Sequence, residues 1–178
     1  MQRRILAVLL DFGDTLADEG STQRDASGFT YDMDLLPGAR ELLIALQERG
    51  YPVGLVADGR VDESTVLRAR HELDSLLDAV VISEEIGATK PDRRPFDAAL
   101  RRLGISPTMA GRVVMVGNRL ERDVRGASEL GMVTVWIDWS ARYGRSPRQP
   151  SEVPDHVIHE PLELLDVLER LETAYDDR

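Results

Sequence analysis

Two aspartates, Asp11 and Asp14, follow an apolar run in the stretch LLDFGDTLAD, residues 9–18. A carboxylate held rigidly at the end of a buried strand can act as a nucleophile or as a metal ligand. Gly13 stands between the two acids and offers a backbone carbonyl without a side chain. The stretch is therefore a candidate catalytic loop; the alternative is that Asp11 is only the polar end of a strand.

Lys90 is the only lysine among the 22 lysine and arginine residues of the chain. A chain that uses arginine everywhere else is expected to keep lysine where a compact ammonium group is needed. Near Asp11, such a group would hold a transferring phosphoryl group and neutralise its charge. In the segment GNRLERD, residues 117–123, Asn118 and Asp123 carry oxygen atoms of the kind that Mg²⁺ prefers.

Short apolar runs alternate with helical patterns along the chain. The predicted strands are 5–10, 53–57, 79–83, 112–117, 133–137 and 156–158. The predicted helices are 37–50, 62–73, 94–104, 120–131 and 161–174. This alternation predicts one α/β domain over residues 1–178, a three-layer Rossmann-like fold with a mainly parallel sheet and helices on both faces. In such sheets ligands bind at the carboxyl ends of the strands, where the candidate residues would meet.

Two segments lack a regular pattern. Residues 17–36 are expected to form a loop or small flap over the end of the sheet, and residues 140–154 a second long loop. We therefore expect no separate cap domain and an open site, shielded only by the flap. An open site would suit a large substrate, or a second copy of the chain that completes the pocket.

The composition excludes several classes of protein. The 178 residues carry a net charge of −10 and no cysteine, which excludes disulfides and thiolate zinc sites. No basic stripe with interleaved aromatics is present, so we expect no nucleic-acid partner. No apolar run is long enough for a membrane span, and the apolar N-terminal run is cut short by Asp11, so we expect a cytoplasmic protein.

Four segments appear in an order that resembles the haloacid dehalogenase (HAD) superfamily. They are LLDFGDTLAD at 9–18, VGLVADGR at 53–60, SEEIGATKPDRRPFDAAL at 83–100 and VVMVGNRLERDVRGASELGM at 113–132. Most members of that superfamily are magnesium-dependent phosphatases. The resemblance implies a phosphatase of the capless or minimal-cap type that acts on a phosphorylated substrate, either a small molecule or a larger one.

The resemblance also implies roles for individual residues. Asp11 would be the nucleophile that takes the phosphoryl group, and Lys90 would hold both Asp11 and the phosphate. The implied ligands of Mg²⁺ are Asp11, the backbone carbonyl of Gly13, Asn118 and Asp123.

The first departure from the family pattern is Gly13, where the family has a second acid that serves as general acid and base. Gly13 keeps the carbonyl for the metal but loses the carboxyl group. The loss of a general acid is expected to cost about 10²–10⁴ in rate. Asp14, one residue further along, is a candidate substitute, and an ordinary turn residue is the alternative.

Two further departures concern the phosphate and the metal. Ala57 replaces a serine or threonine whose hydroxyl would bind phosphate, so the backbone N–H groups of Asp58 and Gly59 would have to do so. Asn118 replaces an aspartate, which should lower the affinity for magnesium because the amide oxygen carries no charge.

Two hypotheses of different classes follow. The first is a magnesium-dependent phosphohydrolase that acts through an aspartyl-phosphate intermediate on Asp11. The second is a HAD-like domain with weakened catalysis that serves as a phosphate-binding or protein-interaction module. Removal of a halide by Asp11 without a metal fits less well, since GNRLERD has the spacing of the metal-binding phosphatases.

Overall fold

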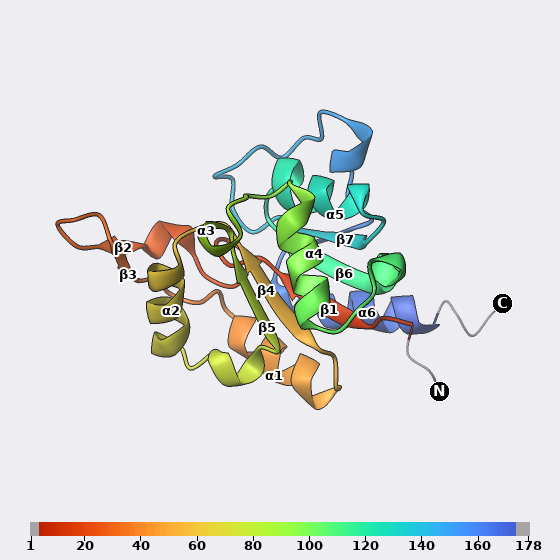
Figure 1. The fold of residues 1–178 in the computed structure, drawn as a ribbon, viewed down its shortest axis with the longest axis horizontal. Coiled ribbons are helices and arrows are strands. Elements are labelled where there is room, and N and C mark those ends of the chain that lie inside the picture. Colours follow the sequence, from red (N-terminus) through yellow and green to blue (C-terminus); the bar gives the residue numbers. More distant parts are fainter. Residues whose placement is uncertain (1–3, 174–178) are drawn as a thin grey trace.

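A six-stranded parallel sheet forms the centre of the computed structural model, which describes residues 4–173 (Figure 1). The strand order is β5-β4-β1-β6-β7-β8, with β1 between β4 and β6. The strands are β1 (Ala7–Leu10), β4 (Val53–Ala57), β5 (Ala79–Ile82), β6 (Val113–Gly117), β7 (Val133–Ile137) and β8 (His156–Ile158). The order of strands reverses beside β1, so the loop after this strand lies where open parallel sheets bind ligands.

Helices cover both faces of the sheet, which confirms the predicted three-layer α/β fold. The helices are α1 (Ala39–Glu48), α2 (Val61–Arg70), α3 (Ser83–Ile86), α4 (Arg93–Arg102), α5 (Arg125–Glu129) and α6 (Leu164–Thr173). Side chains alternate along β1: Val8 and Leu10 belong to the core beneath α1 and α6, while Ala7 and Leu9 pack with α4 and α5. This burial on both faces explains why the strands are apolar throughout.

The largest difference from the predicted elements lies after β6. The single helix predicted over 120–131 begins instead as a π-helical turn, Leu120–Val124, and only then continues as α5. Within the turn, the backbone N–H groups of Asp123 and Val124 both donate to the carbonyl of Arg119. π-Helical turns are common at functional sites, and this one sets the direction of the Asp123 side chain. The predicted last helix begins as a 3₁₀ turn, Pro161–Glu163, and its predicted final residue, 174, lies outside the described residues.

The segment 17–36 forms the flap that its composition predicts, and it has more structure than a loop. A 3₁₀ turn, Glu19–Ser21, precedes a short antiparallel hairpin of β2 (Gln23–Arg24) and β3 (Thr30–Asp32). The hairpin projects beyond the sheet beside α2, at the left of Figure 1. The backbone N–H of Thr30 donates to the Glu63 carboxylate of α2 at 2.8 Å, which ties the flap to the domain.

The second irregular segment, 140–154, contains only a 3₁₀ turn, Pro150–Glu152. Its first residues fold back over the loop that follows β1, where Arg142 pairs with Asp14. Across residues 4–173, no helix has both the length and the apolar character to cross a membrane.

Candidate active site

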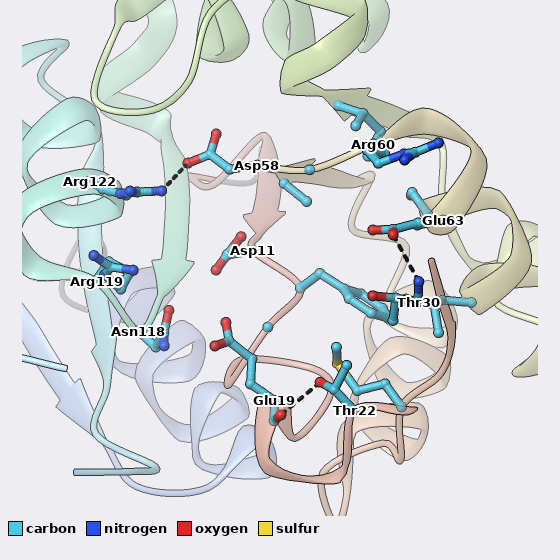
Figure 2. A pocket seen from close by; sticks show the side chains of 18 of the residues that line it. Asp11, Glu19, Thr22, Thr30, Asp58, Arg60, Glu63, Asn118, Arg119 and Arg122 are labelled. Carbon is cyan, nitrogen blue, oxygen red and sulfur yellow. Dashed lines mark hydrogen bonds and ion pairs between the residues drawn. The ribbon is translucent and has the colours of Figure 1, made fainter. Parts of the chain in front are cut away.

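A cavity of about 490 Å³ lies at the carboxyl ends of β1, β4 and β6 (Figure 2). Strand-end loops form its floor, and the flap and the loop after β7 form its walls. The lining residues from the predicted site are Asp11, Gly13, Ala57, Asp58, Gly59, Lys90, Asn118 and Asp123. The expectation that only the flap shields the site was incomplete, because Arg142 and Tyr143 of the second loop also line the cavity.

Lys90 lies at the centre of the site, and its side chain is almost completely buried. Its Nζ atom lies 2.7 Å from Asp11 Oδ1, 2.6 Å from Asp123 Oδ1 and 2.7 Å from the carbonyl oxygen of Val56. These three oxygens belong to the residue after β1, to β4 and to the π-helical turn, so the ammonium group links Asp11 to the other two elements. The sequence-based prediction that Lys90 and Asp11 meet agrees with this geometry.

The charges of this cluster are strongly coupled. Burial alone lowers the pKa of Lys90, but Asp11, Asp123 and Asp58 together outweigh that effect, so its pKa is raised and the ammonium stays charged. The pKa of Asp123 is raised to about 7, chiefly by complete burial and further by the negative charge of Asp11, against the opposing effect of Lys90. A single ammonium group therefore forms ion pairs with two carboxylates, those of Asp11 and Asp123.

Asp123 lines the cavity and at the same time holds Lys90. One carboxylate oxygen lies against Lys90 Nζ, and the other accepts the backbone N–H of Arg119 at 2.9 Å. The side chain also occupies the space beside Gly117, where a Cβ atom would lie 2.3 Å from Asp123 Cγ. Only glycine at position 117 allows this approach. Direct binding of a metal by Asp123 stays a prediction, and in this structure its carboxylate contacts Lys90 and the backbone of Arg119.

The remaining predicted metal ligands fit Mg²⁺ in type. Asn118 Oδ1 is buried and accepts no hydrogen bond from the described residues, and Trp136 Nε1 anchors the Asn118 backbone carbonyl at 3.0 Å. Asp11 offers a carboxylate, and Gly13 offers a carbonyl in the same cavity wall. Magnesium accepts such oxygen ligands and keeps several waters. Within residues 4–173, no group of three or more histidine, cysteine or acidic side chains could hold a metal.

Of the two backbone N–H groups predicted to bind phosphate after β4, the one of Gly59 has another acceptor, and the role of the Asp58 N–H stays a prediction. The backbone N–H of Gly59 donates to Ser83 Oγ at 2.9 Å, so it is already engaged. The carboxylate of Asp58 accepts the backbone N–H of Lys90 at 3.1 Å and Arg122 Nη1 at 3.2 Å. Asp58 therefore orients the lysine loop and Arg122 at the cavity wall (Figure 2), whereas Ala57 contributes only apolar surface.

Asp14 is not placed to act as the relocated acid. Its side chain is fully buried, and its backbone has a left-handed φ of 46°. The carboxylate accepts hydrogen bonds from the Glu19 backbone N–H at 2.9 Å, from Ser140 Oγ at 2.7 Å and from Arg142 Nε at 2.9 Å. Asp14 therefore links the flap to the second loop, and it does not line the cavity.

Glu19 is the residue that sequence reasoning missed. It begins the 3₁₀ turn of the flap, lines the cavity, and directs its carboxylate towards Asp11 and Asn118 (Figure 2). Its Oε1 atom lies 2.3 Å from the place where a side chain at Gly13 would begin. An acid six residues after Gly13, in a segment without periodicity, gives no sequence signal that it returns to this position.

Arginines and one tyrosine form the rest of the polar wall. The guanidinium of Arg119 stacks on the ring of Tyr143 at 3.8 Å, and the Tyr143 hydroxyl donates to Glu19. Arg24, Arg60, Arg122 and Arg142 also line the cavity, where six basic side chains accompany five acidic ones, so the charges of the lining nearly balance. The arginines that follow strand ends thus lie at the cavity and are positioned to contact an anionic ligand.

Comparison with known proteins agrees with this geometry. Residues 12–131 match the family model of haloacid dehalogenase-like hydrolases. The chain is 41% identical over 135 residues to a glyceraldehyde 3-phosphate phosphatase of Methanopyrus kandleri, a match that covers 76% of this chain and 57% of that protein. It is 38% identical over 142 residues to the enzyme of the same name from Pyrococcus furiosus, covering 80% of this chain and 57% of that protein.

Among solved structures, the chain resembles a HAD phosphatase from Thermococcus onnurineus with a TM-score of 0.66 and 29% identity. That match covers 76% of this chain and 59% of the other. The chain therefore spans little more than half the length of these relatives.

Proposed function

Since the chain belongs to the haloacid dehalogenase-like hydrolase family, we propose that it is a magnesium-dependent phosphomonoesterase that acts through an aspartyl-phosphate on Asp11. The observation that carries this proposal is the position of Asp11 directly after β1, on the floor of a cavity lined by several arginines and 2.7 Å from a buried ammonium group. Magnesium is typical of the family. Its proposed ligands here are Asp11, the Gly13 carbonyl and Asn118.

Each residue around the cavity has a distinct role in the proposed reaction. Asp11 attacks the phosphorus atom, while Lys90 fixes its carboxylate and stabilises the negative charge of the phosphoryl group. Arg119 and Arg122 lie on the side of the cavity across from Arg60, and they offer donors to the phosphate oxygens or to a second anionic group of the substrate (Figure 2). The metal, when bound, would supply further positive charge beside Asp11.

The cavity favours a small substrate. Its volume of about 490 Å³ falls within the roughly 300–1,000 Å³ of small-molecule sites. The relatives are named for small phosphorylated compounds: glyceraldehyde 3-phosphate, and among further matches phosphoserine and ribulose 1,5-bisphosphate. We therefore propose a small organic phosphate as the substrate class.

The proposal is tested by phosphate release across a panel of sugar, amino-acid and nucleoside monophosphates, with Mg²⁺ and with chelator. We expect turnover of at least one member of the panel, and its loss in chelator followed by recovery on adding Mg²⁺. Binding of phosphate without turnover of any compound would favour the alternative of a phosphate-binding module.

The amide at position 118 gives a separate prediction about the metal. Asn118→Asp adds a negative charge within contact distance of the proposed magnesium, and unit charges about 4 Å apart interact by several kcal/mol at the effective dielectric of a protein site. We therefore expect the Mg²⁺ concentration for half-maximal turnover to fall by about 10-fold or more, since about 1.4 kcal/mol is a factor of ten. Asn118→Ala should raise it. An unchanged magnesium requirement in both variants would remove Asn118 from the ligand set.

A further inference from the structure

We propose that the Glu19 carboxyl group is the general acid and base of this active site and takes the place of the acid that position 13 lacks. This inference rests on the proposed phosphatase function. It assigns a catalytic residue to the flap, eight positions after the proposed nucleophile Asp11.

The first argument is the space beside Gly13. A Cβ atom built on Gly13 would lie 2.3 Å from Glu19 Oε1, 2.9 Å from Glu19 Cγ and 3.0 Å from Glu19 Cδ. The carboxyl group of Glu19 thus occupies the volume that an aspartate side chain at position 13 would need. The flap returns a carboxylate to the same point from a different position in the chain.

The second argument is that the structure holds this carboxylate in place. The backbone N–H of Glu19 donates to the buried carboxylate of Asp14 at 2.9 Å, which fixes the start of the 3₁₀ turn. Tyr143 donates its hydroxyl to Glu19 Oε2, and burial together with this hydrogen bond raises the pKa of Tyr143 to about 12, so the phenol stays a donor. Asp14 and Tyr143 are therefore positioning residues for Glu19. The side chain remains 31% exposed, so a substrate can reach it.

The third argument is that each of the other acids lining the cavity has another role or is already hydrogen-bonded to the protein. Asp11 is the proposed nucleophile, and Asp123 is enclosed between Lys90 and a backbone N–H. The Asp58 carboxylate accepts hydrogen bonds from Arg122 Nη1 and from the backbone N–H of Lys90. The Glu63 carboxylate accepts a hydrogen bond from the backbone N–H of Thr30. Glu19 is the remaining lining carboxylate, and one of its oxygens faces the loop of the nucleophile.

The proton transfers follow from this position. As Asp11 bonds to phosphorus and the bond from phosphorus to the ester oxygen breaks, protonated Glu19 gives its proton to the departing alkoxide, which leaves as an alcohol. The Glu19 carboxylate then takes a proton from the water that attacks the aspartyl-phosphate. The bond between phosphorus and Asp11 breaks, inorganic phosphate leaves, and both carboxyl groups return to their starting states.

The first test compares leaving groups in Glu19→Gln, which keeps the size of the side chain. For alkyl phosphates, which need a proton donor, we expect turnover to fall by about 10²–10⁴-fold. For p-nitrophenyl phosphate, whose leaving group needs none, we expect a rapid burst of one p-nitrophenol per site and accumulation of phosphorylated Asp11. Asp34→Asn, a change of an exposed acid after the flap hairpin, is the matched control and should behave like wild type.

An equal loss for both kinds of ester, with no burst, would overturn the inference and point to a structural role. A change in the magnesium requirement alone would also overturn it, because Glu19 would then be a metal ligand. No turnover in the wild-type protein would contradict the proposed function and this inference with it. Turnover that depends on Asp11 but is indifferent to Glu19→Gln would contradict only the role of Glu19.

The second test exchanges the two positions. Gly13→Asp alone places a side chain against Glu19, so it should lower both stability and turnover. The double variant Gly13→Asp, Glu19→Ala should turn over substrate at least about 10-fold faster than Glu19→Ala alone. The φ of Gly13 lies outside the left-handed region, so contact with Glu19 is the obstacle to be relieved. If the double variant is no better than Glu19→Ala, the two carboxylates are not equivalent and the inference fails.

Discussion

Replacing Asp11 by Asn is expected to lower magnesium-dependent phosphate release by about 10⁴–10⁶-fold, the effect of removing a covalent nucleophile. The amide has almost the same shape but cannot form the acyl phosphate. The reason for expecting so large an effect is the geometry around Lys90, which directs one oxygen of Asp11 to the ammonium group and leaves the carboxylate at the floor of the cavity.

This prediction has two readouts besides steady-state rate. Wild-type protein quenched in acid during turnover should carry a phosphoryl group on Asp11 in a fraction of the molecules, and Asp11→Asn should carry none. The variant should still fold, because Lys90 keeps Asp123 as a partner and the charge repulsion between the two carboxylates is removed. Full turnover in Asp11→Asn, or a phosphoryl group on another residue, would contradict the aspartyl-phosphate mechanism.

Replacing Lys90 by Met is expected to lower the free energy of unfolding by about 3–5 kcal/mol, because it leaves buried carboxylates without their counter-charge. Asp11 and Asp123 would then face each other across a site that excludes most water. Turnover should be lost as well. Urea unfolding measures the stability, and Arg93→Met, which breaks an exposed ion pair with Asp97, is the control and should cost well under about 1 kcal/mol.

The loss of unfolding free energy in Lys90→Met should grow as the pH rises. Asp123 already has a pKa of about 7, far above its ordinary value of 3.8, because it is buried, and without Lys90 this pKa rises further. A carboxyl group whose pKa is raised by folding favours the folded state while it is protonated, and this contribution is lost as the pH rises through the folded-state pKa. The variant should therefore recover stability below about pH 6 and be least stable above about pH 8. Adding Asp123→Asn to Lys90→Met should restore much of the free energy of unfolding at high pH. If it does not, the unpaired charge of Asp123 is not the cause of the destabilisation.

Sequence patterns were sufficient for the fold. The strands over 53–57, 133–137 and 156–158 have the predicted bounds, and the alternation with helices gives the three-layer sheet. These features depend on local periodicity and on burial of whole faces, which a single chain displays along its length. The juxtaposition of Asp11 and Lys90 also followed, because the carboxyl ends of parallel strands share one edge of the sheet.

Only the tertiary structure decided what each acid in the site does. Asp14 is adjacent to the missing acid in sequence, yet its left-handed backbone and three donors turn it into a structural link. Asp123 has the spacing of a metal ligand, yet the π-helical turn directs it to Lys90. Glu19 had no motif, yet the flap brings it to Gly13. Spacing specifies which residues can reach one edge of the sheet, but the direction of a side chain depends on turns, charges and contacts between distant segments, which no local pattern records.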